Sequence, residues 1–424
     1  MAIHKQVLAM ILAGGEGKRL FPLTLDRAKP AVPFGGKYRI IDFVLNNFAN
    51  SGIYQVKILT QFKSDSLNRH IARTWPMGPF FGHYTDLVPA QMRIDKEWYL
   101  GTADAIYQNL NLIYDDMPDI VCVFGGDHIY RMDVSQMVAT HREKNADVTI
   151  AAIPVPVERA REFGVIEVDE DFRIIAWQEK PKNPKEMPGR PGFSLCSMGN
   201  YIFQREALIE ETERDAADTS SKHDFGHNVI PHMIKSGRAV YAYDFYTNEI
   251  PGVTSEEEQG YWRDVGDIDS YWEAHMDLVN VSPVFNLYNG EWPIRTHSYQ
   301  APPAKFVFDE DQRRGTATDS LVSDGCIISG GRLHRCVLSP HVRINSFSHI
   351  EDSILMHGVN VGRYAVIKKA IIDKGVEIPP NTQIGVDTEE DKARGFTVSP
   401  GGVTVVAKGT VLSTSSQRPA SIGI

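Results

Sequence analysis

The chain has 424 residues, four cysteines and a formal net charge of −10. This length predicts two or three domains rather than a single core. The acidic balance argues against a nucleic-acid binder, and no apolar run is long enough to cross a bilayer or to form the core of a secretory signal. The cysteines form no C-x-x-C motif, so we expect neither disulfides nor a zinc site, and we expect a cytoplasmic location.

The first predicted element is a buried strand at residues 7–13, which ends in a turn at Gly14 and Gly15. Glycines let backbone N–H groups approach phosphate oxygens, and a helix expected after the turn would point its N-terminus at the same anion. Three cations, Lys18, Arg19 and Lys29, follow within the next fourteen residues. This segment therefore predicts a phosphate-binding loop.

Two common phosphate loops do not fit this segment. A Walker A motif needs Ser or Thr after its Gly-Lys pair, but Lys18 is followed by Arg19. A dinucleotide fingerprint needs a third glycine where Leu20 stands. The longer run from residue 11 to residue 36 instead resembles the opening signature of sugar-phosphate nucleotidyltransferases.

Up to about residue 275, apolar strands alternate with amphipathic stretches, which is typical of an α/β sheet. The predicted strands are residues 56–60, 120–125, 148–153 and 197–203. Residues 103–114 predict one helix, residues 183–192 a loop, and residues 248–260 a solvated surface loop.

The last quarter of the chain changes period. Aliphatic residues recur about every six positions, at Leu321, Ile327, Leu333, Leu338, Ile344, Ile350, Met356, Val366, Ile372, Ile378 and Ile384. Neither a helix nor an alternating strand has this period, which fits a triangular parallel β-helix. Five-residue steps at 333–338, 356–361 and 361–366 are interpreted as register slips. An irregular β-sandwich is the alternative.

Two carboxylates stand at positions that suit a metal ion. Asp127 follows the apolar strand 120–125, and Asp264 lies between an aromatic residue and a glycine turn. Two oxygen ligands together with substrate phosphates are a usual way to hold magnesium. The alternatives are a helix cap for Asp127 and a turn residue paired with Arg263 for Asp264.

A second polar group follows a strand in the middle of the chain. Glu179 and Lys180 precede Pro181, and adjacent strand residues point to opposite faces, so both reach one ligand only if the strand end twists. An ordinary exposed ion pair is the alternative. Trp98 and Tyr99 precede a glycine turn and suit an aromatic wall over a nucleotide or sugar, or plain core packing.

Several longer motifs carry a resemblance over nearly the whole chain. They are GGKYRIIDF from residue 35, WYLGTADAI from 98, GGDHIY from 125, FGVIEVD from 163, QEKP from 178, SMGNYIF from 197, HDFG from 223 and WRDVG from 262. With the β-helix, they make the chain similar to the bacterial glucose-1-phosphate adenylyltransferases. RIIDF and HDFG favour that family over the uridylyl, thymidylyl and guanylyl relatives.

The resemblance implies a fold and a domain organisation. It implies a Rossmann-like α/β nucleotidyltransferase domain with a mixed sheet (GT-A-like) at residues 1–279, a linker at 280–319, and a left-handed parallel β-helix of hexapeptide repeats at 320–424. The β-helix would serve regulation and oligomerisation.

The resemblance also implies the reaction of ATP with α-D-glucose 1-phosphate to ADP-glucose and pyrophosphate, with Mg²⁺, for glycogen or α-glucan synthesis. The implied sugar phosphate ligands are Tyr99, Gly164, Glu179, Lys180 and Ser197. The implied ATP site comprises Gly14, Gly15, Gly17, Arg19, Gln61 and Gly101. Asp127 and Asp264 would hold the metal, and the catalytic set would be Arg19, Lys29, Asp127 and Lys180.

The family pattern is only partly met in the regulatory residues. Relatives activated by fructose 1,6-bisphosphate carry a lysine where this chain has Asp26, which should weaken a bisphosphate site. Candidate effector ligands are Arg27, Arg39, Lys368, Lys369 and Arg394. The family is tetrameric, so we expect a homotetramer that responds to small-molecule effectors.

Three rival functions stay open at this point. They are a non-catalytic regulatory paralogue that binds sugar phosphates, an enzyme that uses another NTP, and an additional acyl transfer by the β-helix histidines. Those histidines are His334, His341, His349 and His357.

Overall fold

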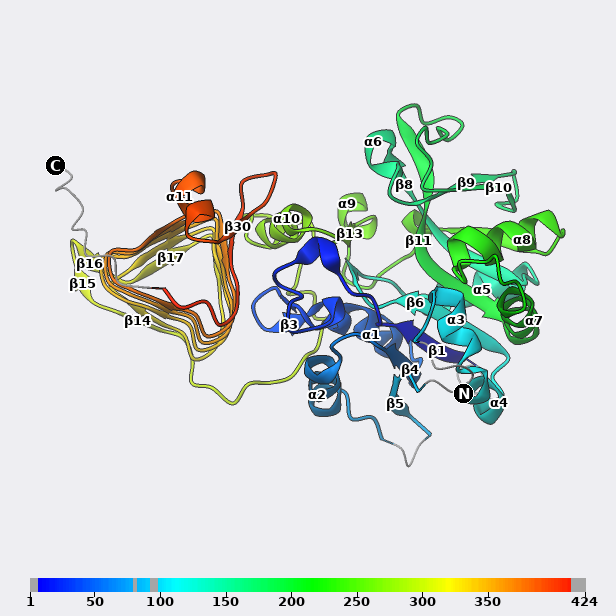
Figure 1. The fold of residues 1–424 in the computed structure, drawn as a ribbon, viewed down its shortest axis with the longest axis horizontal. Coiled ribbons are helices and arrows are strands. Elements are labelled where there is room, and N and C mark those ends of the chain that lie inside the picture. The colour runs from blue at the N-terminus through cyan, green and yellow to red at the C-terminus, as the bar shows by residue number, and fades with distance from the viewer. Residues whose placement is uncertain (1–6, 79–81, 92–97, 413–424) are drawn as a thin grey trace. The chain divides into compact units, whose positions relative to one another are not determined.

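The computed structural model describes residues 7–78, 82–91 and 98–412 (Figure 1). The chain forms two compact units. The first comprises the residues up to Gly15, Phe43–Trp262 and Asn289–Pro293, and the second comprises Glu16–Asp42, Arg263–Tyr288 and the residues from Ile294 onward. Among the described residues, no helix combines the length and the apolar character needed to cross a membrane.

A nine-stranded mixed sheet forms the core of the first unit. Its strands are β1 (Val7–Leu12), β4 (Gln55–Thr60), β5 (Tyr84–Pro89), β6 (Ile120–Gly125), β8 (Val148–Pro156), β9 (Gly164–Val168), β10 (Ile174–Glu179), β11 (Phe193–Gln204) and β12 (Val240–Asp244). β1 pairs in parallel with β4 and β6, whereas β11 is antiparallel to β6, β8 and β9. The five strands predicted from apolar runs in this unit are confirmed. The short strands β7 (His128–Tyr130) and β13 (Trp262–Asp264) do not belong to this sheet and form a two-stranded sheet of their own.

Helices surround this sheet, and apolar side chains of both fill the core. They are α1 (Ile40–Asn50), α2 (Asp65–Thr74), α3 (Thr102–Tyr107), α4 (Leu110–Asp116), α5 (Val134–Glu143), α6 (Val157–Ala160), α7 (Arg205–Ala216), α8 (Ile230–Lys235) and α9 (Glu256–Gln259). Fully buried Val123 and Phe203 of the sheet cluster with Phe225, which begins a π-helical turn, Phe225–Val229.

The single helix predicted at residues 103–114 is wrong, because the structure has two helices there. Asn109 lies between them with φ −119° and ψ 20°, outside helical geometry. Its side-chain amide donates to the carbonyl of Ala105 at 2.8 Å and to the hydroxyl of Tyr99 at 2.9 Å. A side chain that bonds the backbone four residues back competes with the helix ladder, which explains the break.

The surface loop predicted at residues 248–260 is partly wrong, because it contains α9. Glu258 is not solvated: its side chain is 11% exposed and lies 2.6 Å from the guanidinium of Arg131, which is 2% exposed. A buried ion pair therefore anchors this segment to the residues that follow β7.

In the second unit, the helix expected after the glycine turn is only a 3₁₀ turn, Lys18–Leu20. Pro22 lies two residues beyond it and has no N–H to continue a helix. Gly17 has φ +63°, and a Cβ there would lie 3.0 Å from side-chain atoms of both Lys29 and Thr24. The hydroxyl of Thr24 donates to the Gly17 carbonyl at 2.9 Å, so this loop is held in a tight turn that requires glycine.

The second unit contains the predicted β-helix, which Figure 1 shows end on as a triangle. One side comprises β14 (Lys305–Val307), β19 (Ile327–Ser329), β22 (Arg343–Ile344), β25 (Asn360–Val361) and β28 (Glu377–Ile378). The next comprises β17 (Thr316–Thr318), β20 (Arg332–His334), β23 (His349–Glu351), β26 (Val366–Lys368) and β29 (Gln383–Ile384). The third comprises β18 (Leu321–Val322), β21 (Val337–Leu338), β24 (Ile354–Leu355), β27 (Ala370–Ile372), β31 (Thr404–Val406) and β30 (Thr397–Val398).

The remaining elements of the second unit are short. They are the 3₁₀ turn Lys29–Ala31, the hairpin strands β2 (Pro33–Phe34) and β3 (Tyr38–Arg39), the hairpin strands β15 (Asp309–Glu310) and β16 (Arg313–Arg314), and the helices α10 (Ile268–Leu278) and α11 (Thr388–Ala393). β14 and β17 belong to the parallel sides of the triangle, although both lie in the segment 280–319 that the sequence assigns to a linker.

The predicted six-residue register is right at most positions and off by one residue at four, Leu321, Ile327, Met356 and Val366. Ile327 and Val366 are only half-buried, and their neighbours Ile328 and Ile367 are fully buried instead. From Leu333 onward each coil takes 17 residues, since Leu333 pairs with Ile350 and Ile350 with Ile367. Two steps of six and one of five therefore close each coil.

The five-residue step predicted between Leu333 and Leu338 agrees with the strand register. The steps predicted around Met356 do not: Leu355, not Met356, pairs with Leu338, and the shorter step falls between Ile350 and Leu355. Met356 is buried all the same. Adjacent aliphatic residues allow two registers, so the sequence pattern cannot choose between them.

Candidate active site

The predicted nucleotide ligands of the first unit lie at one edge of the sheet. Gly14 follows β1, Gln61 follows β4 and Asp127 follows β6, and these three strands are parallel neighbours. The Gly126 N–H donates to the Leu12 carbonyl at 3.0 Å. A Cβ on Gly14 would lie 3.2 Å from the Cβ of Gln61. The carboxyl ends of parallel strands are where open α/β sheets bind ligands.

Gly15 and Asp127 are the accessible members of this edge. A Cβ on Gly15 would meet no atom within 4 Å, so its backbone faces open space. The Asp127 side chain is 36% exposed, and its carboxylate lies 3.7 Å from Nε2 of His128. A ligand can therefore reach both positions.

The strand-end twist that the sequence required at Glu179 and Lys180 is present. β10 ends at Glu179, and Lys180 adopts φ +48°, a left-handed conformation that is uncommon outside glycine. The Lys180 N–H donates to the Phe163 carbonyl at 3.1 Å. Its ammonium lies 3.5 Å from the Glu179 carboxylate, so both side chains reach the same side of the chain. The Lys180 side chain is 58% exposed and that of Glu179 is 14% exposed.

Two glycines confine the Glu179 carboxylate. Gly164 of β9 is its strand partner, and a Cβ there would lie 3.0 Å from Glu179 Oε2 and 2.4 Å from the Trp177 ring. A Cβ on Gly226, in the π-helical turn, would lie only 2.5 Å from the same oxygen. The sequence reasoning found Gly164 but missed Gly226, although the HDFG motif contained it.

The turn at Gly101 is joined to the same motif. A Cβ on Gly101 would lie 2.2 Å from the His223 carbonyl oxygen, which accepts the Ala103 N–H at 2.9 Å. The Thr102 hydroxyl donates to Asp224 at 3.0 Å and accepts the Phe225 N–H at 3.0 Å. Burial disfavours the Asp224 carboxylate, but hydrogen bonds from His227 and Thr102 outweigh it and hold its pKa below the usual range.

The remaining predicted sugar ligands have defined partners. The Tyr99 hydroxyl accepts a hydrogen bond from Asn109, while the Ser197 hydroxyl accepts the Gly199 N–H at 3.1 Å. Burial raises the pKa of Tyr201, and the charges of Asp224 and Glu179 add to that shift. These two carboxylates thus act on the same buried ring from separate segments.

The second unit gathers the predicted phosphate cations around a carboxylate. The Lys29 ammonium lies 3.1 Å from Asp264, with the two side chains 9% and 15% exposed. A Cβ on Gly266 would lie 3.0 Å from the Arg19 guanidinium and 3.1 Å from the Asp264 carboxylate. Lys18 differs, because its side chain is 83% exposed and pairs with Glu16 at 2.6 Å.

Two of the five candidate effector cations, Arg27 and Arg39, lie near the same lysine. The Arg27 guanidinium is 4% exposed and binds both carboxylate oxygens of Asp373, at 2.8 and 2.9 Å. Burial, together with the charges of Arg39 and Arg27, lowers the pKa of Lys374 to about 7. Arg27 and Arg39 thus share their surroundings with Lys374, which sequence reasoning missed.

The other three candidates have partners of their own. The Lys368 ammonium lies 3.3 Å from Glu351, Lys369 donates to the Gly401 carbonyl at 2.7 Å, and Arg394 donates to Asp391 at 2.7 Å.

The comparisons with known proteins agree on the family. Residues 8–281 match the family model for nucleotidyl transferases, and residues 302–406 match the GlmU-like C-terminal hexapeptide model. The chain is 57% identical over 406 residues to the glucose-1-phosphate adenylyltransferase of Anaeromyxobacter sp. (strain Fw109-5), covering 95% of this chain and 98% of that protein.

Two further relatives are similar over as much of the chain. The glucose-1-phosphate adenylyltransferase of Thermus thermophilus is 58% identical over 412 residues, covering 96% of this chain and 99% of its own length. That of Cutibacterium acnes is 54% identical over 404 residues, covering 95% and 97%. The chain therefore belongs to the nucleotidyl transferase family and, within it, to the glucose-1-phosphate adenylyltransferases.

Proposed function

We propose that the protein transfers the adenylyl group of ATP to α-D-glucose 1-phosphate and forms ADP-glucose and pyrophosphate for glycogen or other α-glucan synthesis. The observation that carries this proposal is the Glu179–Lys180 strand end. It presents a carboxylate and an ammonium 3.5 Å apart on one side of the chain, beside two glycines. A carboxylate accepts hydrogen bonds from sugar hydroxyls and an ammonium binds a phosphate, so the pair suits a sugar phosphate.

The exposure of the Lys180 and Glu179 side chains indicates which part of the sugar phosphate each would bind. Lys180 would bind the phosphate, because its ammonium is the more accessible of the pair. Glu179 would accept hydrogen bonds from sugar hydroxyls and Ser197 would accept or donate them, while Tyr99 and the backbone at Gly164 would shape the pocket. The close approach of Gly164 and Gly226 to Glu179 supports a fixed position for its carboxylate.

The ATP side would be formed by backbone groups and cations. Backbone N–H groups at Gly14 and Gly15 would bind phosphate, and Gln61 and Gly101 would complete this part of the ATP site. Gly17 and Arg19 belong to the loop that follows. Arg19 and Lys29 would balance the triphosphate charge, and their shared position beside Asp264 supports this role.

Asp127 and Asp264 would hold the divalent metal that nucleotidyltransferases of this type use, and we propose magnesium. Both donors are carboxylate oxygens, which magnesium prefers. The Trp262 ring lies 5.2 Å from that of His128, the residue after Asp127. Asp264 lies two residues after Trp262, so the Cα atoms of these two residues are at most about 7 Å apart even in extended backbone. Chain connectivity thus supports a shared site.

The chemistry needs no general base. The second pKa of a sugar phosphate is about 6, so its oxygen is already an anionic nucleophile at neutral pH. The barrier is the approach of two anions and the departure of pyrophosphate. When bound, the metal would lower this barrier by screening charge on the phosphates. Arg19, Lys29 and Lys180 would add fixed positive charge and align the nucleophile with the α-phosphorus.

Regulation and assembly complete the proposal. We place an effector site at Arg27, Arg39 and Lys374, where a phosphorylated or carboxylated metabolite would offset the crowded positive charge. Asp26 lies 3.6 Å from Lys408, and its charge disfavours a bisphosphate. The proposed organisation is a catalytic domain at 1–279, a linker at 280–304 and a left-handed β-helix that begins with β14 at Lys305, in a cytoplasmic homotetramer.

The direct test is pyrophosphate release from glucose 1-phosphate with each NTP, with and without fructose 6-phosphate, fructose 1,6-bisphosphate, pyruvate and AMP. We expect a preference for ATP of at least tenfold and a response to one or more effectors. No turnover with any NTP would favour a non-catalytic paralogue, and a preference for UTP or GTP would favour another sugar nucleotide. A flat effector response would remove the regulatory site.

A further inference from the structure

A buried carboxylate that the proposed reaction does not use joins helix α7 to the HDFG motif. Asp215 lies in the last turn of α7 and is 2% exposed. One of its oxygens accepts the Ser221 hydroxyl at 2.8 Å, and the other lies 3.0 Å from Nδ1 of His223, which must be the donor because a carboxylate only accepts. The Ser221 hydroxyl accepts the His223 N–H at 2.9 Å. Asp215 therefore holds His223 directly through its side chain and, through Ser221, by its backbone.

Local structure alone does not explain why these two residues stand here. The last turn of a helix carries partial negative charge, which disfavours a carboxylate, and the burial of a carboxylate costs further free energy. His223 has φ +53°, a left-handed conformation that is uncommon outside glycine. Costs of this kind persist where the surrounding contacts hold a functional geometry. Both costs meet at one contact, the hydrogen bond between Asp215 and His223.

The carbonyl of His223 contacts the N-terminus of α3. It accepts the N–H of Ala103 at 2.9 Å and that of Asp104 at 3.3 Å. The first N–H groups of a helix have no partner within the helix, so this carbonyl caps α3. A Cβ on Gly101 would lie 2.2 Å from the same oxygen. The position of this carbonyl thus fixes the turn at Gly101, on the proposed ATP side.

The same segment contacts the proposed sugar side three residues later. A Cβ on Gly226 would lie 2.5 Å from Glu179 Oε2, so the backbone of the motif abuts this carboxylate. Between the two contacts, Asp224 accepts the Thr102 hydroxyl at 3.0 Å. Residues 221–226 therefore touch both proposed substrate sides, and Asp215 holds the beginning of this segment to α7.

We propose that Asp215 is a positioning residue for both substrates. Through His223 it fixes the carbonyl beside Gly101, and through the residues that follow it fixes the contact of Gly226 with Glu179. This role rests on the proposed function, because it requires ATP beside Gly101 and the sugar phosphate at Glu179. Asp215 is buried and acts through His223, so it is not a catalytic residue. Its loss weakens the binding of ATP and of glucose 1-phosphate together.

The test measures KM for each substrate by steady-state pyrophosphate release from the full-length chain. Asp215→Ala and His223→Phe remove the two partners of the hydrogen bond in turn. We expect each to raise both KM values at least about fivefold, since both sides of the site lose their alignment. The double variant should exceed the larger single effect by less than about twofold, because residues that act through one contact are not additive.

His223→Asn is the conservative variant that should restore binding. The amide nitrogen of asparagine occupies the position of Nδ1, and Asn145 of this chain already has φ +45°. Phenylalanine tolerates this backbone too, as Phe347 shows with φ +66°, so His223→Phe tests the donor and not the turn. We expect His223→Asn to keep both KM values within about twofold of the wild type.

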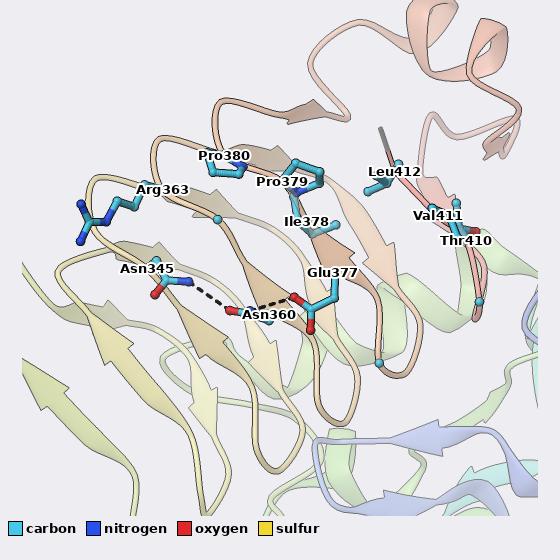
Figure 2. A pocket seen from close by; sticks show the side chains of 13 residues that line it. Asn345, Asn360, Arg363, Glu377, Ile378, Pro379, Pro380, Thr410, Val411 and Leu412 are labelled. Atoms are coloured by element: carbon cyan, nitrogen blue, oxygen red, sulfur yellow. Dashed lines mark hydrogen bonds between the residues drawn. The ribbon is translucent and has the colours of Figure 1, made fainter. Parts of the chain in front are cut away.

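Two controls separate this role from a general loss of hydrogen bonds. His232→Phe is the matched control, because His232 bonds a second buried carboxylate of α7, Glu211, at 2.9 Å. Asn360→Ala removes the hydrogen bonds to Asn345 and Glu377 in a cleft of the β-helix, drawn in Figure 2. Both controls should leave the two KM values unchanged.

Several outcomes would overturn the inference. They are unchanged KM values in His223→Phe, a rise in KM for one substrate alone, and His223→Asn as impaired as His223→Phe. A role in stability alone would lower the melting temperature and the active fraction, and hence kcat, but leave KM as in the wild type. If Asp215→Ala does not fold, the two His223 variants still decide. A wild type without turnover would overturn the proposed function and this inference with it.

Discussion

Replacing Gly226 with alanine tests whether the π-helical turn positions Glu179 for the sugar. The new Cβ would lie 2.5 Å from Glu179 Oε2, about 0.9 Å inside the 3.4 Å at which ordinary contact begins. The carboxylate therefore has to move by roughly that amount. Displacements of about 1 Å cost up to about 100-fold in rate, so we expect kcat/KM for glucose 1-phosphate to fall by about 10- to 100-fold, or ~1.4–2.7 kcal/mol.

The assay is steady-state pyrophosphate release in a double-mutant cycle. Gly226→Ala in a Glu179→Ala background should cost less than about threefold, because residues that act through one contact are not additive. Gly290→Ala is the control, since a Cβ there would meet no atom within 4 Å. Full additivity of the two substitutions, or an unchanged kcat/KM for Gly226→Ala, would refute the reasoning.

Three further predictions concern the anion site, the metal site and pH. Lys180→Ala should raise KM for glucose 1-phosphate about tenfold or more through lost phosphate binding, and an unchanged KM in initial-rate assays would contradict this role. Asp127→Asn should lower kcat about 100-fold or more with little change in that KM; near-normal kcat would exclude metal binding by Asp127. His275 accepts the Gly35 N–H through Nε2 at 3.1 Å and donates through Nδ1 to the Tyr271 carbonyl, and its burial lowers its pKa to about 4. The unfolded chain, with a pKa near 6.5, binds the proton first as pH falls, so the wild type should lose on the order of 3 kcal/mol of stability between about pH 6.5 and 4. In urea denaturation, His275→Gln should reduce the slope near pH 5 by about 1.4 kcal/mol per pH unit, and an unaltered slope would contradict the assignment.

Sequence patterns predicted the elements and the family well, because buried strands are apolar runs bounded by glycine. The strand before Gly14 and the strand before Asp127 are examples, and both ends lie at the same sheet edge. The family named from the motifs is confirmed by the family models and by relatives over nearly the whole chain.

What the sequence did not predict depends on contacts between distant residues. The burial of Arg27 follows from Asp373, 346 positions later, and no local pattern reports it. Likewise, the need for glycine at position 226 comes from the Glu179 carboxylate, which is distant in the sequence. In the β-helix, Ile327 and Ile328 are chemically equivalent, so only the pairing of coils determines which one is buried.

In the proposed reaction, an oxygen of glucose 1-phosphate attacks the α-phosphorus of ATP. Glucose 1-phosphate that carries ¹⁸O at its three non-ester oxygens tests this directly, with mass spectrometry of both products. We expect ADP-glucose with all three labels and pyrophosphate with none. Label in pyrophosphate, or no ADP-glucose at all, would contradict it.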